Sequence, residues 1–145
     1  MKRMDLPPVW ATLFMALAWA LAHIAPIATF GARPMTAKMC LVAGIVLIGW
    51  SVIWFLRRAT PLEPRKTPKT LLVSGPFWIN RNPIYTGLAL LLTALALWLG
   101  ALSAALTVPA FLWVIHTRFV RDEEAALRAA FGAEAEAYLA RTRRW

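Results

Sequence analysis

Four long apolar runs, separated by short charged blocks, set the pattern of this chain. They cover about residues 9–30, 39–56, 84–99 and 101–117. A helix of about 22 residues is about 33 Å long, which is enough to cross a hydrocarbon core of roughly 30 Å. The pattern therefore predicts an all-α fold, a polytopic membrane protein with four transmembrane helices.

The segments between and after these runs differ in character. Residues 57–82 hold four prolines among charged residues, which excludes a membrane-spanning helix, so we expect a loop there. Residues 118–145 place Leu127 and Phe131 at helical spacing, which predicts a C-terminal amphipathic cytoplasmic helix. We expect this helix to lie on the membrane surface or to fold back over the 57–82 loop. Gly100 alone separates the last two runs, and this predicts a tight helical hairpin.

Lys and Arg are distributed unevenly between the two sides of this layout. If both termini share a side, two basic residues precede the first run, six fall within residues 57–81 and six follow from residue 118 onward. Only Arg33 and Lys38 then lie on the opposite side. Because an excess of Lys and Arg marks the cytoplasmic side, we expect both termini, the 57–82 loop and the 118–145 tail in the cytoplasm.

Composition favours a single membrane domain over residues 1–145 and narrows the possible functions. The chain is 60% apolar and 16% charged, more apolar than a soluble protein. Its net charge of +9 falls in blocks that suit membrane topology and anionic lipids, so we expect no nucleic-acid partner. Cys40 lies inside an apolar run, and neither His23 nor His116 has a partner at metal-ligand spacing, so we expect no metal centre.

The densest group of polar and aromatic residues, residues 74–87, lies at the start of the third run. Asn82 followed by Pro83 is typical of a helix start, because an N-cap acceptor precedes a proline whose missing N–H costs nothing there. This structural role alone accounts for both residues. The functional interpretation is that the free N–H groups of the helix start, with Arg81 beside them, bind a carboxylate or phosphate.

Two further groups also have a structural and a functional interpretation. Phe77 and Tyr85 are typical interfacial anchors, and their rings are also suited to stacking on a purine or attracting a cation. Residues 122–124 are three consecutive acids in a chain with seven. They favour the start of a following helix through its dipole, and they are also suited to a ribose diol or a positively charged ligand.

Residues 62–144 resemble the integral-membrane methyltransferases that include isoprenylcysteine carboxyl methyltransferase and the related phospholipid methyltransferases. The resemblance rests on Leu72-Val73-Ser74-Gly75-Pro76-Phe77, Arg81-Asn82-Pro83-Ile84-Tyr85-Thr86-Gly87, a helical hairpin, Glu123-Glu124, Phe131-Gly132 and a Tyr138 to Arg144 ending. It implies S-adenosylmethionine as cofactor and a lipophilic acceptor in the bilayer, either isoprenylcysteine-like or another lipid or hydrophobic molecule. We also expect the protein in a bacterial inner membrane.

The resemblance further implies which residues form the site. The cofactor contacts fall on Lys69, Thr70, Leu71, Leu72, Phe77, Asn82, Pro83, Ile84, Tyr85 and Glu123. The nearest match to the family's substrate-side arginine is Arg118, displaced by one residue. The best-known members carry His at the position of Asn82, and asparagine cannot take up a proton near neutral pH.

These assignments predict methyl transfer by in-line displacement at the sulfonium methyl carbon, with proximity and alignment as the enzyme's contribution. In this scheme Tyr85 and Glu123 orient the donor. Arg118 or Arg121 holds an acidic acceptor, and Glu124 accepts the proton of an amine acceptor. Two other functions stay open: a membrane reductase of the steroid-reductase type, and a non-catalytic transporter or scaffold subunit.

Overall fold

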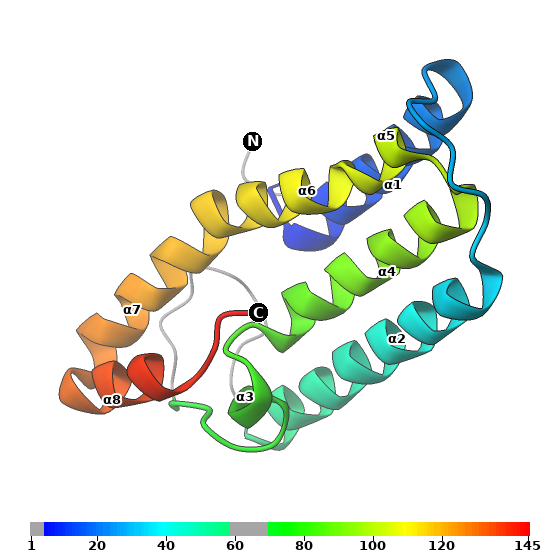
Figure 1. Ribbon diagram of the computed structural model, residues 1–145. Coiled ribbons are helices and arrows are strands. Elements are labelled where there is room, and N and C mark those ends of the chain that lie inside the picture. The colour runs from blue at the N-terminus through cyan, green and yellow to red at the C-terminus, as the bar shows by residue number, and fades with distance from the viewer. Residues whose placement is uncertain (1–4, 59–69) are drawn as a thin grey trace.

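The computed structural model describes residues 5–58 and 70–145, in which helical segments run up and down in an antiparallel bundle (Figure 1). The elements are α1 (Pro7–Ile24), α2 (Pro34–Arg57), α3 (Pro76–Ile79), α4 (Pro83–Leu99), α5 (Leu102–Ala105), α6 (Thr107–Ile115), the π-helical turn η2 (His116–Val120), α7 (Arg121–Phe131) and α8 (Ala133–Arg141). The predicted all-α polytopic membrane fold is confirmed.

Three helical stretches are long and apolar enough to cross a membrane, namely Pro7–Ile24, Pro34–Arg57 and Leu102–Phe131. The third extends beyond the apolar region, because α7 places four charged residues in its first turn and therefore lies past the membrane-spanning part. The apolar helix α4 has 17 residues, or about 26 Å, close to the length that a spanning helix needs. The protein is an integral membrane protein.

Helix α4 lies at the centre of the bundle, with α2 on one side and α1 and α6 on the other (Figure 1). Leu92 of α4 and Phe111 and Ile115 of the last long helix are fully buried in one core cluster. Towards α2 the packing is closer, since a Cβ added to Gly44 would lie 2.8 Å from the carbonyl oxygen of Gly87. Small residues allow apolar helices this close approach.

One end of the bundle, which we call the turn end, consists of residues 25–33 and 97–102. Gly100 ends α4 in the left-handed conformation, with φ of 67°, and its carbonyl oxygen accepts a hydrogen bond from the Phe30 N–H at 2.8 Å. The Leu102 N–H donates to the Ile27 carbonyl at 3.1 Å. The turn end is therefore closed largely by main-chain groups, and α4 and α5 form the hairpin expected at Gly100.

The first two helices begin and end at residues that differ from the predicted ones. We expected the first span to run to residue 30, but α1 ends at Ile24, because Pro26 disfavours helical geometry at Ala25. The second span, expected from residue 39, already begins at Pro34, where proline occupies the first helical turn.

The last span and the tail also differ from the expectation. The predicted span 101–117 continues as one helical stretch to Phe131 through η2, since no proline follows Pro109 and no glycine lies between Gly100 and Gly132. The single amphipathic helix expected in the tail is divided into α7 and α8 at Gly132, whose φ is 51°. The short helix α3 lies within the predicted 57–82 loop, of which residues 59–69 are outside the described part.

Candidate functional site

The end of the bundle opposite the turn end, which we call the charged end, brings the start of α4 together with the start of α7. Tyr85, in the first turn of α4, is 8% exposed. Its hydroxyl donates a hydrogen bond to Oε1 of Glu123, in the first turn of α7. Its ring lies 6.5 Å from that of Phe119, measured between centroids. Two residues that are 38 positions apart in the sequence are thus in direct contact.

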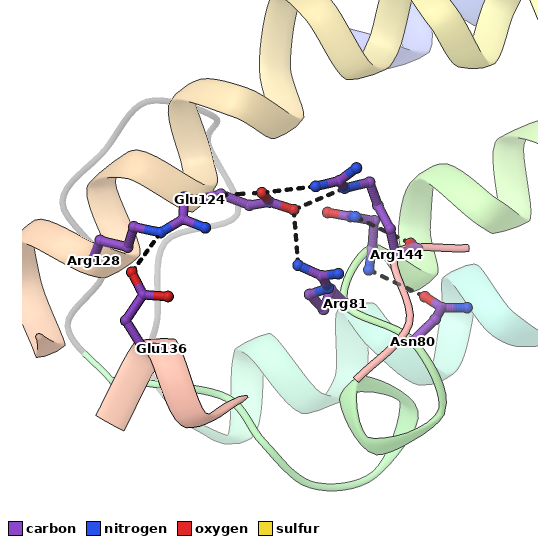
Figure 2. A network of polar contacts seen from close by, with 7 residues as sticks. Asn80, Arg81, Glu124, Arg128, Glu136 and Arg144 are labelled. Carbon is purple, nitrogen blue, oxygen red and sulfur yellow. Dashed lines mark hydrogen bonds and ion pairs between the residues drawn. The ribbon is translucent and has the colours of Figure 1, made fainter. Parts of the chain in front are cut away.

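The neighbouring residue Glu124 is the centre of an ion-pair network (Figure 2). Arg144 binds it with two parallel hydrogen bonds, from Nε to Oε1 at 2.9 Å and from Nη2 to Oε2 at 3.0 Å. Arg81 adds a bond from Nη1 to Oε1 at 3.1 Å, and Arg128 lies 4.0 Å from Oε2. The Glu124 side chain is only 9% exposed, so this carboxylate is a buried junction of three segments.

The network lowers the pKa of the Glu124 carboxyl group. Burial by itself raises the pKa of its carboxyl group. The hydrogen bond and the charge of Arg144, followed by the charges of Arg81 and Arg128, outweigh burial and hold this pKa below its usual range. The hydrogen bond to Glu124 in turn raises the pKa of Arg144. Glu124 is therefore an ionised anchor for arginine side chains and a weak proton acceptor.

Asn82 precedes α4, but its side chain does not cap the helix as the sequence predicted. Its Nδ2 donates instead to the carbonyl oxygen of Arg144 at 3.1 Å, and its own N–H donates to Oδ1 of Asn80 at 3.1 Å. The capping prediction is wrong because the side chain is engaged by the C-terminal segment. Pro83, at the first helical position, is fully buried, and Ile84 packs against the core cluster.

The predicted cofactor residues that precede α4 fall into different environments. Lys69 lies outside the described residues, Thr70 is exposed and Leu71 is half-buried. Leu72 and Phe77 are buried, and the Phe77 ring meets the ring of Phe55 edge-on at 5.3 Å between centroids. Phe77 thus joins α3 to α2, which is a packing role whatever else it contacts.

Arg118 lies in the π-helical turn η2 and is directed towards the start of α1. Its Nε is 3.4 Å from Oδ1 of Asp5, and its guanidinium lies over the Trp10 ring at 5.0 Å from the centroid. The Trp10 indole N–H donates to the same Asp5 oxygen at 3.0 Å. Arg118, Asp5 and Trp10 thus form a second charged cluster, separate from the arginines bound to Glu124. It lies at a π-helical turn, and such turns are frequent at functional sites.

Sequence reasoning missed two members of the charged end, Asn80 and Arg144. Asn80 is 5% exposed, and Arg144 lies 20 residues from its carboxylate partner. Asn80 lies within the polar and aromatic group of residues 74–87, and Arg144 lies in the Tyr138 to Arg144 ending of the resemblance, but neither residue was assigned to the site. A contact made across a chain reversal has no periodicity that would reveal it.

The fold and the charged end together define an integral membrane protein with a polar site at one end of its helices. The phospholipid methyltransferase family matches residues 32–134, and the chain belongs to this family. The match includes the whole of α2, α4 and α7, and with them Tyr85, Glu123 and Glu124. The protein is therefore a membrane methyltransferase. Comparison with curated proteins and with solved structures gives no significant match.

Proposed function

We propose that this methyltransferase transfers the methyl group of S-adenosylmethionine to a lipophilic acceptor held in the bilayer, and that the donor binds at the charged end. The observation that carries the proposal is the contact between Tyr85 and Glu123. It joins the first turns of α4 and α7 within the segment matched by the family.

The groups present at the charged end suit this donor. S-adenosylmethionine supplies a methyl group on a sulfonium centre and also carries a carboxylate, an ammonium group, a ribose diol and an adenine ring. Glu123 offers a carboxylate for the diol or the ammonium group, and the ring of Tyr85 offers an aromatic surface. Nε of Arg81 is buried and has no hydrogen-bond partner among the described residues, so a donor for a ligand carboxylate is at hand.

Each side chain then has a role that follows from its contacts. Tyr85 and Glu123 orient the methyl donor. Glu124 stays ionised and organises the arginines. An acidic acceptor is already deprotonated at neutral pH, so its methylation needs no strong base. In our proposal Arg118, held by Asp5 and Trp10, marks the acceptor side, where its charge attracts an acidic headgroup or a carboxylate.

The proposal also includes an orientation. We place the charged end, with both termini, in the cytoplasm of a bacterium with the bundle in the inner membrane, because Lys and Arg are concentrated at this end. S-adenosylmethionine is a polar cytoplasmic metabolite, whereas a lipophilic acceptor reaches the same site laterally from the bilayer. Access from two phases is the reason why the site lies at the end of the helices.

Methyl incorporation tests the proposed function directly. The purified protein, reconstituted in vesicles of mixed phospholipid and isoprenoid lipid, would be incubated with S-adenosylmethionine labelled in its methyl group. We expect label in the organic extract with the wild type, and at least tenfold less with the Tyr85→Phe, Glu123→Gln double variant, which loses the contact between α4 and α7. Gly49→Ala, in an open position of α2, is the control. Equal incorporation by the double variant would refute the site.

A further inference from the structure

Residues 142–145, which we call the strap, pass across the start of α4. Thr142 is 7% exposed, and Asn80 pairs with Arg143 in a parallel bridge. The Arg81 N–H donates to the Arg143 carbonyl oxygen at 2.8 Å. In Figure 2 the strap brings Arg144 beside Arg81 and opposite Glu124. The strap is therefore built into the charged end by main-chain and side-chain contacts together.

Arg144 makes two separate links from the strap. Its guanidinium holds both oxygens of Glu124, at 2.9 and 3.0 Å, which is the planar fork that arginine forms with a carboxylate. Its carbonyl oxygen accepts the hydrogen bond from Nδ2 of Asn82 at 3.1 Å. A single residue thus connects the first turn of α7 with the residue that precedes α4.

The strap is held firmly where it begins. Tyr138, in α8, is 3% exposed, and its hydroxyl donates to the Phe77 carbonyl oxygen at 2.8 Å. Burial raises the pKa of Tyr138 to about 12, so this hydroxyl keeps its proton throughout the neutral range. Because α8 is fixed to α3 in this way, the strap reaches α4 from an anchored base.

We infer that Arg144 is a positioning residue for methyl-donor binding, acting through Glu124 and Asn82. Glu124 follows Glu123 in the first turn of α7, and Asn82 lies three residues before Tyr85. Arg144 therefore holds both elements that present the Tyr85 and Glu123 contact. The inference rests on the proposed function. The strap lies beyond residues 32–134, over which the family matches, and the resemblance of the Tyr138 to Arg144 ending gave Arg144 no role.

Calorimetric titration with S-adenosylhomocysteine, the demethylated form of the donor, tests this role without knowledge of the acceptor. We expect Arg144→Gln to bind it about tenfold more weakly than the wild type. Arg144→Lys keeps the charge but not the fork, so an intermediate affinity is expected. The matched control is Arg141→Gln, which removes the same charge from an exposed position on α8 and should bind like the wild type.

A double-mutant cycle distinguishes positioning from a general loss of structure. If Arg144 acts through Glu124, the Glu124→Gln, Arg144→Gln variant should bind no more weakly than Glu124→Gln alone. The double variant also leaves no buried carboxylate without its arginine, so it can be measured in place of Arg144→Gln if that single variant fails to fold. Additive losses, or equal affinities of Arg144→Gln and Arg141→Gln, would overturn the inference. A wild type that does not bind would instead refute the proposed function.

Discussion

The two ends of the helical bundle are closed by different kinds of contact. At the turn end, main-chain hydrogen bonds join residues 25–33 to residues 97–102, and a Cβ added to Gly100 would clash with the backbone of Gly31. At the charged end, side-chain ion pairs add to the main-chain contacts of residues 142–145, with Glu124 bound by Arg81 and Arg144. The turn end therefore depends on its backbone geometry, whereas the charged end depends on which side chains are present.

This difference assigns structure to one end and chemistry to the other. A closed main-chain turn offers fewer groups to a ligand, because several of its donors and acceptors are already paired with each other. The charged end has the buried carboxylate of Glu124, the partly buried one of Glu123, several arginines and the buried phenol of Tyr85, and these groups are able to recognise a charged molecule. Substitutions at the turn end should therefore change stability alone, while those at the charged end should change binding as well.

The largest effect is expected for Glu124→Ala. Removing this carboxylate leaves Arg81 and Arg144 unpaired in a site that is mostly buried, which costs about 3 kcal/mol of the free energy of unfolding. Binding of S-adenosylhomocysteine should be lost with it. Thermal unfolding in detergent, followed by circular dichroism, measures the loss of stability. Calorimetric titration measures the loss of S-adenosylhomocysteine binding. An unchanged unfolding midpoint would contradict the network's structural role.

Gly100→Ala should destabilise the turn end by about 2 kcal/mol, from the left-handed backbone and the clash together. An added Cβ would lie 2.6 Å from the Gly31 carbonyl carbon, and φ is 67°. Below its unfolding temperature the variant should bind the donor analogue like the wild type. Gly49→Ala, where the added Cβ meets nothing within 4 Å, should keep or raise stability. Weakened binding in folded Gly100→Ala would remove the distinction between the two ends.

Acid should act on the charged end through Glu124. Its pKa is lower in the folded than in the unfolded state, so its contribution is complete above the unfolded value and is lost as the pH falls through the folded value. Unfolding midpoints measured from neutral pH to below the usual value of 4.5 should fall more steeply for the wild type than for Glu124→Gln. Parallel pH profiles would show that the ion pairs do not stabilise the fold.

The smallest effect is expected for Glu136→Ala. Its side chain is 60% exposed and pairs with Arg128 at 2.8 Å on the outer side of the network. Exposed ion pairs contribute little, so a loss of about 0.5 kcal/mol or less is expected, with donor binding unchanged. A loss of stability as large as that of Glu124→Ala would mean that burial does not decide how much an ion pair contributes to stability.

The helices could be predicted because apolar runs of spanning length have few alternatives in a membrane. Their ends were less predictable, since Pro26 ends α1 before its apolar run ends, and the charges after Val120 do not interrupt the last helix. Only Gly132, with its positive φ, divides the tail. Single proline and glycine residues therefore set where the helices end, whereas the apolar runs set where the membrane helices lie.

At the candidate site, the sequence placed Tyr85, Glu123 and Glu124 at the same end of the bundle. The contact between Tyr85 and Glu123 depends on how α4 packs against the last long helix, and the bonds of Arg144 depend on the chain reversal at Gly132. No local pattern encodes either of them. Asn82 illustrates the limit, because its position before Pro83 indicated a cap while its side chain binds the strap. At Asn82 a tertiary hydrogen bond to Arg144 has taken the place of the expected side-chain cap.

The central claim is that the charged end binds the methyl donor, and titration of the purified protein with S-adenosylhomocysteine tests it most directly. The account predicts binding to the wild type, affinity about tenfold weaker in Tyr85→Phe because a hydrogen bond to a charged group is lost, and wild-type affinity in folded Gly100→Ala. No binding at about millimolar ligand, or equal affinities of Tyr85→Phe and the wild type, would contradict it.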